Sequence, residues 1–279
     1  MSATAVSLAD DAARGTRVTS PRSLSLAAWQ SASREETVVE ERTTSKSEYH
    51  GLSDFFNVRE ANANVAGGQW EFEFTTEWAT GAGGDDDARI TESIKYGITN
   101  DLFIELEVLP INLGDGGDQG AGDLSLILFN QFMHETETMP AFAAWAEMRV
   151  PSGEGSSGVD GSFHFNLTKA VIGKLRGHLE GFVETANGGR GDEDANRRHF
   201  QWGTGFGFDC KCTDRMVTTV NYLISSSAAY GHANTHVVEL GASYALSDSQ
   251  SLKVAFDVGV DGREETPDFA TKLLWSIEF

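Results

Sequence analysis

The sequence has no run of about 18 consecutive apolar residues, so none of its 279 residues is predicted to cross a membrane as an α-helix. Proline is scarce, with 5 residues, whereas glycine is abundant, with 30. That balance is typical of many β-strands joined by glycine-rich turns. A membrane is not excluded, because β-strands of about ten residues with alternating hydropathy also cross one.

Basic residues are few, with 21 Lys and Arg against 42 Asp and Glu and a formal net charge of −21. Nucleic-acid phosphates are bound by clustered Lys and Arg, so this composition excludes nucleic acid as a partner. The two cysteines lie in Cys210-Lys211-Cys212. Their spacing is too tight for an easy disulfide, and further zinc ligands are lacking nearby. We therefore expect no cofactor and no metal site.

Residues 1–66 show no sustained hydrophobic period and are rich in serine, threonine, alanine and charge. Their first ten residues, MSATAVSLAD, do not have the basic region with which a secretory signal begins. We interpret residues 1–66 as an N-terminal extension that is partly disordered, and as either the remnant of an export signal or a plug. Residues 67–279 are predicted to form an outer-membrane β-barrel, for the following reasons.

After the extension the hydrophobic period is two, which is the period of a β-strand with two unlike faces. In the first such segment, Trp70, Phe72 and Phe74 share one face, and Glu71 and Glu73 share the other. Twelve segments are predicted, at Gln69–Trp78, Ala88–Thr99, Leu102–Leu109, Asp123–His134, Ala141–Val150, Ser162–Ile172, Leu175–Glu184, His199–Cys210, Arg215–Ile224, Thr235–Leu246, Ser251–Val260 and Phe269–Phe279.

Tight turns and long glycine-rich loops alternate between these segments, which puts the long loops at one end of the sheet, as in outer-membrane barrels. A soluble β-sandwich is the alternative, because its strands alternate as well. No helical segment remains to cover the aromatic face, and the opposite face has too many carboxylates for a dry core. The sequence therefore predicts an all-β fold, a closed antiparallel up-and-down transmembrane β-barrel of twelve strands.

In such a barrel the apolar face meets lipid and the charged face meets the lumen. Carboxylates outnumber basic side chains on the charged face, so the lumen is predicted to be narrow, acidic and selective for cations. Glu92 and Lys169 fall on the lipid face unless a β-bulge turns them inward. The predicted lumen-lining residues are Glu71, Glu73, Glu105, Glu107, Asp123, Glu147, Arg149, Arg176, His178, Glu180, Asp209, Glu239, Lys253, Asp257 and Lys272.

The last segment ends on an aromatic residue, with Trp275, Ile277 and Phe279 on its apolar face. Bacterial outer-membrane proteins resemble this pattern. It predicts a strand that closes the barrel and carries the C-terminal signal recognised by the outer-membrane assembly machinery.

One segment contains Ser162-x-His164-x-Asn166. Some twelve-stranded barrels are hydrolases with a Ser–His pair, and a catalytic serine needs a base within hydrogen-bond reach and a third group that orients the base. A motif this short is a weak signal. We expect no enzyme and assign no catalytic residue.

Three short motifs, in order, resemble those of one family. IKYGITNDLFIELEVLP (94–110) is similar to a hairpin of the outer-membrane proteins of the MetA pathway of phenol degradation, and GAGDLSLILFNQF (120–132) and RVPSGEG (149–155) resemble two further motifs of that family. The resemblance covers residues 70–279. It implies a porin-like β-barrel channel or transporter for small compounds, often aromatic or apolar.

The leading hypothesis is an outer-membrane channel for passive passage of small solutes, with the lipid bilayer and those solutes as its partners. A second hypothesis is a structural or adhesin-type barrel whose loops and N-terminal extension bind partners. A third is a soluble β-sandwich carrier, which would need no detergent. The bacterial outer membrane is the expected location under the first two.

Overall fold

The computed structural model describes residues 52–279 except 82–85, 114–119, 154–155, 188–195 and 263–265. The described residues belong to one compact unit, Thr44–Phe279. The predicted extension thus lies outside the described residues up to residue 51, and only residues 52–66 of it are described. No helix in the described part of the chain is long and apolar enough to span a membrane.

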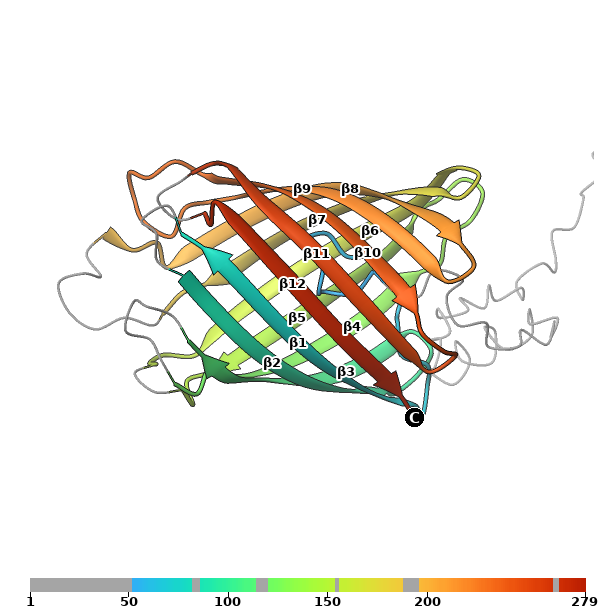
Figure 1. Ribbon diagram of the computed structural model, residues 1–279, viewed down its shortest axis with the longest axis horizontal. Coiled ribbons are helices and arrows are strands. Elements are labelled where there is room, and N and C mark those ends of the chain that lie inside the picture. Colours follow the sequence, from blue (N-terminus) through green and yellow to red (C-terminus); the bar gives the residue numbers. More distant parts are fainter. Residues whose placement is uncertain (1–51, 82–85, 114–119, 154–155, 188–195, 263–265) are drawn as a thin grey trace, which may run out of the picture. The chain divides into compact units, whose positions relative to one another are not determined.

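Twelve strands pair antiparallel in chain order, and β1 also pairs with β12, so the sheet closes into a barrel (Figure 1). The predicted all-β fold of twelve antiparallel strands is therefore confirmed. The strands are β1 (Trp70–Thr80), β2 (Asp86–Gly97), β3 (Leu102–Asn112), β4 (Leu124–Met133), β5 (Ala141–Val150), β6 (Asp160–Ile172), β7 (Leu175–Thr185), β8 (Phe200–Thr213), β9 (Met216–Ser225), β10 (Thr235–Ala245), β11 (Gln250–Asp261) and β12 (Phe269–Glu278).

The predicted bounds lie within three residues of these. The largest differences are at the ends of β3 and β8. β3 continues past the predicted Leu109 and through Pro110. The register between β2 and β3 shifts between Val108 and Ile111, so Pro110 lies in a β-bulge. A proline is tolerated at such a bulge, where its missing N–H is not needed.

The ends of the described barrel meet in β1 and β12. Glu71 lies opposite Glu278, and Phe74 lies opposite Trp275. Trp70 and Phe279 exchange two backbone hydrogen bonds, each 3.0 Å from N to O. The final strand therefore closes the barrel, as its alternating pattern predicts, and no free edge remains at this seam.

The outer face of the barrel is apolar and rich in aromatic residues near both ends of the strands. Near the start of β1, the rings of Trp70 and Tyr96 have centroids 4.6 Å apart. Near its end, the ring centroids of Trp78 and Phe269 are 6.5 Å apart. Aromatic side chains at the two ends of an apolar band are typical of barrels that span a bilayer.

Two charged residues interrupt the outer face, as predicted. Glu92 lies opposite Phe74 without a shift in register and is exposed. The bulge lies in the facing strand β3, so it does not turn Glu92 inward. Lys169 lies beside the turn between β4 and β5, where its Nζ is 3.0 Å from a carboxylate oxygen of Glu135.

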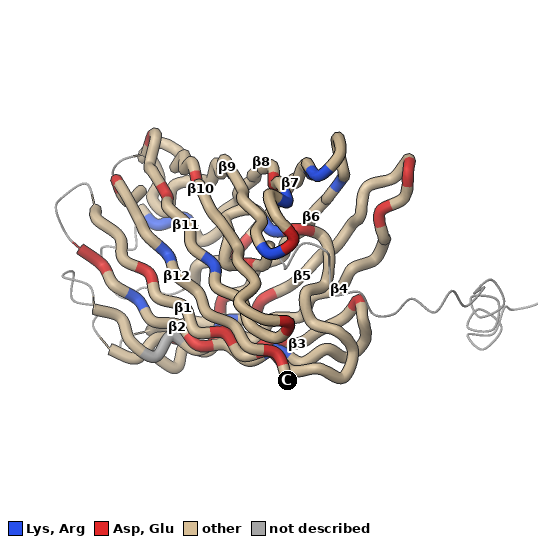
Figure 2. Tube along the Cα trace, turned by 45° about the vertical axis from the view of Figure 1, so that its right-hand side comes forward, with Lys and Arg blue, Asp and Glu red and all other residues tan. Residues whose placement is uncertain are grey.

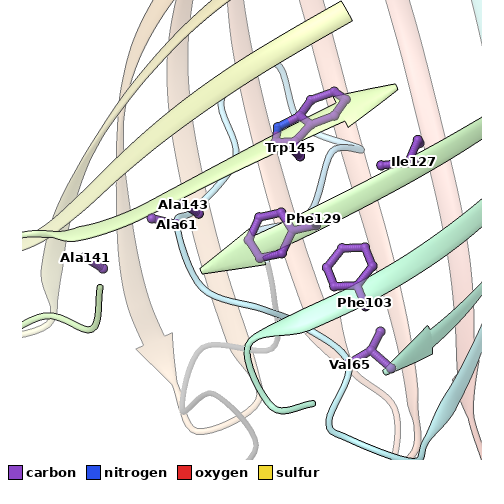
Figure 3. Close-up of a cluster of buried hydrophobic side chains, with 8 residues drawn as sticks. All are labelled: Ala61, Val65, Phe103, Ile127, Phe129, Ala141, Ala143 and Trp145. Carbon is purple, nitrogen blue, oxygen red and sulfur yellow. The ribbon is translucent and has the colours of Figure 1, made fainter. Parts of the chain in front are cut away.

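The interior of the barrel contains residues 52–66, which we call the inner segment (Figure 1). Its side chains Ala61 and Val65 pack against inward side chains of β3, β4 and β5 (Figure 3). Leu52, Phe55 and Phe56 pack against Val217, Ala255 and Leu274, from β9, β11 and β12. Both clusters of buried apolar side chains therefore lie inside the barrel, between the inner segment and the strands.

The turn between β2 and β3 fixes the point where the inner segment leads into β1. Asn100 Oδ1 accepts a hydrogen bond from the Gly67 N–H at 3.0 Å, and the Gly68 N–H donates to the carbonyl of Gly97 at 2.7 Å. A Cβ on Gly97 would lie 2.0 Å from the Ala66 carbonyl oxygen, so this position of the YGITN motif must be glycine.

Candidate functional site

The inner segment is held by its backbone. Four alternate N–H groups donate to inward side chains of four different strands, which is the pattern of an extended chain of period two. Two of the acceptors are carboxylates, which make stronger hydrogen bonds than neutral groups. The bonds run from Asn57 to Glu239 (2.9 Å), Arg59 to Glu180 (3.0 Å), Ala61 to Thr168 (2.8 Å) and Ala63 to Gln131 (3.3 Å).

The first of three buried charge clusters centres on Lys95, whose side chain is fully buried. Its Nζ lies 2.7 Å from Glu73, 3.4 Å from Asp54 of the inner segment and 3.6 Å from Glu105. Lys253 approaches the other oxygen of Glu73 at 3.4 Å. Cations of the wall thus neutralise carboxylates of both the wall and the inner segment.

The second cluster centres on Lys272. Its Nζ lies 2.6 Å from Glu239 and 3.2 Å from Asp257, and it donates to Asn57 Oδ1 at 3.1 Å. Asn221 also donates to Glu239, at 2.7 Å. Because Glu239 accepts from Asn57 as well, this carboxylate joins three strands to the inner segment.

The third cluster centres on Arg176. Its guanidinium contacts Asp209 at 2.5 Å and Glu60 of the inner segment at 2.7 Å. Glu60 also accepts from the Leu52 N–H at 2.9 Å, which closes the inner segment into a loop. His178 Nε2 is 3.1 Å from Asp209. A buried carboxylate with this many donors is well compensated for its loss of water.

The predicted lumen residues therefore divide by position. The structure brings most of them into the three clusters or against the inner segment, and charged positions occur all along the strands (Figure 2). Glu71 is also buried, Glu107 and Glu147 are partly exposed, Arg149 is exposed, and Asp123 precedes β4 in a loop. Their role as the lining of a solute path stays a prediction.

A small, open polar pocket lies where β5, β6 and β7 reach the long loops. Three carboxylates and one guanidinium surround it, so its electrostatic potential favours positive charge over negative charge. It is lined by Glu147, Arg149, Asp160, Gly161, Ser162, Glu184 and Thr185.

The structure brings Ser162 and His164 together, and a carboxylate contacts the other ring nitrogen of His164. His164 Nε2 is 3.1 Å from Ser162 Oγ, and His164 Nδ1 is 3.0 Å from Glu180, so the third group is not Asn166. Glu147 Oε2 lies 3.5 Å from Ser162 Oγ. An oxyanion formed at Ser162 would face this carboxylate, the opposite of what acyl transfer requires.

The sequence analysis did not identify the inward aromatic residues. Four aromatic side chains lie on the same inward face of their strands as the polar residues: Phe103, Phe129, Trp145 and Phe182. Strand parity could have found them, since Phe103 shares its face with Glu105. One wall of the interior is therefore aromatic, while the other carries the Lys95 and Lys272 clusters.

Asp123 connects two of the family-like motifs. Its Oδ1 accepts from the N–H groups of Ser152 (3.1 Å) and Gly153 (2.8 Å), and Ser152 Oγ accepts from the Leu124 N–H at 2.9 Å. Partial burial raises the pKa of the Asp123 carboxyl, but hydrogen bonds from Ser156, Gly153 and Ser152 outweigh it and hold the pKa below its ordinary value. The GDL and PSG sequences thus form one loop anchor.

Replacing Asp123 with asparagine is expected to accelerate amide hydrogen exchange at Ser152 and Gly153 several-fold, because a neutral acceptor binds N–H groups more weakly. Since the folded-state pKa is lowered, the anchor contributes fully above the ordinary pKa and is lost as the pH falls through the lowered one. Hydrogen exchange by mass spectrometry over that range measures both effects. Asp160→Asn, which affects a contact with Asn187 instead, should leave these two amides unchanged.

The sequence matches no family model, and it matches none of the curated proteins compared with it. Solved structures do match. An outer membrane channel from Pseudomonas putida F1 superposes with a TM-score of 0.60 at 14% identity, over 78% of this chain and 98% of that one.

Two porins also match. The NanC porin has a TM-score of 0.53 at 9% identity, over 74% of this chain and 98% of its own. The KdgM porin, solved in complex with disordered oligogalacturonate, has a TM-score of 0.51 at 8% identity, over 75% and 98%. The chain has the fold of outer-membrane channels and porins. At these identities the likeness concerns the fold alone.

Proposed function

We propose that this protein is an outer-membrane channel for the passive passage of small solutes, and that the inner segment closes it in the state described here. The observation that carries the proposal is a closed twelve-stranded barrel with an apolar outer face and a charged, hydrogen-bonded interior. An apolar exterior needs lipid, and an interior of this polarity is characteristic of a lumen rather than of a dry core.

The proposed location is the bacterial outer membrane, with its lipid bilayer as the surrounding partner. The C-terminal residues Trp275, Ile277 and Phe279 lie on the strand that closes the barrel. We assign them the role of signal for the outer-membrane assembly machinery. Each of the three motifs that resemble the MetA-pathway family includes a turn or loop of this barrel and part of an adjoining strand, which supports a channel of that kind for small aromatic or apolar compounds.

The inner segment sets how the channel opens. Residues 52–66 are part of the predicted extension, and their contacts favour the plug over the export-signal remnant. Once this segment leaves, the carboxylates it contacts face the lumen, where they attract cations and repel anions. We propose a narrow, acidic, cation-selective lumen in the open state.

The partly exposed Glu107 and Glu147 test this selectivity. In a bilayer with a KCl gradient, the reversal potential of the open channel should lie toward the equilibrium potential of K⁺. The double variant Glu107→Gln with Glu147→Gln should reduce the cation-to-anion permeability ratio several-fold. The control is Glu135→Gln with Glu137→Gln, at the exposed turn after β4, which should leave the ratio unchanged. A reversal potential toward the equilibrium potential of Cl⁻ would contradict the acidic lumen.

The alternative is a structural or adhesin-type barrel that never conducts. It is favoured by one observation, the extent to which the inner segment fills the interior. Bilayer recordings separate the two functions: a barrel that passes no current even after the inner segment is released serves as a scaffold.

A further inference from the structure

Five ring side chains face the interior from five consecutive strands. Phe103 on β3 lies opposite Phe129 on β4, which lies opposite Trp145 on β5. Trp145 lies opposite His164 on β6, and His164 opposite Phe182 on β7. Directly paired positions on one face are the closest in a sheet, so these residues form one continuous row, which we call the aromatic row.

Three of the four neighbouring ring pairs in the aromatic row stack. Phe103 and Phe129 have centroids 4.8 Å apart and planes 13° apart. Trp145 and His164 are 3.5 Å apart at 14°, and His164 and Phe182 are 5.0 Å apart at 20°. Neighbouring rings in these pairs are thus nearly parallel, and Phe103, Phe129 and Trp145 are visible in Figure 3.

A guanidinium already occupies the centre of this row. The Arg59 guanidinium carbon lies 4.2 Å from the ring centroid of Phe129, 5.7 Å from that of Phe103 and 5.8 Å from that of Trp145. Arg59 is 1% exposed, and its three guanidinium nitrogens have no hydrogen-bond partner among the described residues. Ring faces attract a cation, but they satisfy none of the N–H donors of a guanidinium.

The surroundings favour positive charge over negative. Glu180 accepts from the Arg59 N–H and meets His164. Glu105 lies on the same face of β3 as Phe103, and its Oε2 has no hydrogen-bond partner in the described part of the chain. An anion entering here would meet these carboxylates, whereas a cation would gain from both the rings and the charge.

We propose that the aromatic row is a binding subsite for flat aromatic solutes that carry a positive charge, of the amidinium or guanidinium class, and that Arg59 occupies it as an internal stand-in. The inference rests on the proposed function, since the solute reaches the row through the lumen after the inner segment moves. Arg59 and the solute compete for the same ring faces. Removing the arginine side chain therefore raises the apparent affinity of the subsite.

Benzamidine, a ring bearing a flat cation, is the probe, and benzoate has the same ring with the opposite charge. Binding to the detergent-solubilised full-length protein is measured by isothermal titration calorimetry. Arg59→Ala should bind benzamidine at least about tenfold more tightly than the unaltered protein. Adding Trp145→Leu should weaken that binding about tenfold, the effect of losing one desolvated cation–π partner.

Matched controls come from the outer face. Trp202→Leu in the Arg59→Ala background changes an exposed tryptophan and should leave benzamidine binding unchanged. If Trp145→Leu does not fold, as judged by heat-modifiable gel migration, Phe129→Leu replaces it and Phe206→Leu becomes its control.

Three results would overturn the proposal: no benzamidine binding to Arg59→Ala, benzoate binding at least as tight as that of benzamidine, or equal effects of the inner and outer variants. Because calorimetry does not depend on conduction, its outcome is separate from that of the channel. Benzamidine binding by a barrel that passes no current would refute the proposed function and leave the subsite standing.

Discussion

Replacing Glu60 with alanine is expected to convert a closed barrel into a conducting one. Glu60 pairs with Arg176 at 2.7 Å inside the barrel and also accepts from the Leu52 N–H. Removing one partner of a buried ion pair costs about 3–5 kcal/mol. Arg176 keeps Asp209, so the loss falls on the docking of the inner segment rather than on the barrel wall. The population of barrels whose inner segment is released should rise by about 10²–10⁴-fold.

Planar-bilayer recordings measure this change as the fraction of time that single channels conduct. Glu135→Ala is the matched control, since Glu135 is an exposed glutamate whose ion pair with Lys169 lies outside the barrel. The control should stay closed. Equal opening in both variants would mean that the contacts of Glu60 do not hold the channel shut.

Replacing Lys95 with methionine is expected to produce the largest loss of stability. Lys95 is fully buried and lies near three carboxylates, those of Glu73, Asp54 and Glu105. Without the ammonium group these carboxylates remain buried together with too little positive charge. We expect the free energy of unfolding to fall by about 3–5 kcal/mol. Urea unfolding in detergent or lipid vesicles, followed by gel mobility, measures the loss.

The control for this experiment is Lys169→Met, because that lysine pairs with Glu135 at the surface and should contribute less than about 1 kcal/mol. A second variant tests the mechanism. Lys95→Met combined with Glu73→Gln removes one negative charge from the cluster and should regain part of the stability. A double variant that is no more stable than Lys95→Met would point to lost packing instead of uncompensated charge.

The strands could be predicted from the sequence because the wall of the barrel is one sheet thick and its two faces differ: the outer face is apolar and the inner face is largely polar. Each strand of this chain then alternates, as Trp70 to Trp78 does, and the alternation survives errors of two or three residues at the ends. The seam between β1 and β12 followed as well, since its last strand has the same alternation and a terminal aromatic residue.

The inner segment could not be predicted in the same way. Residues such as Asn57, Arg59 and Ala61 have no local period, and their partners Glu239, Glu180 and Thr168 lie on three distant strands. No short-range rule couples positions so far apart in the sequence. The polar composition of this stretch also argued for disorder, whereas its carboxylates Asp54 and Glu60 pair with Lys95 and Arg176 inside the barrel.

The direct link between the inner segment and β1 has a consequence for biogenesis. Residues 52–66 come directly before β1, the first strand of the barrel. The seam closes only when the last strand, β12, pairs with β1, so the inner segment and the closing strand come from opposite ends of the described chain. Lys95 finds Asp54, and Arg176 finds Glu60, only when that leading stretch is already threaded. Insertion into lipid with the leading stretch left outside would yield an intermediate whose sheet is closed but whose Lys95 and Arg176 lack their partners in the inner segment, and threading would be its final maturation step.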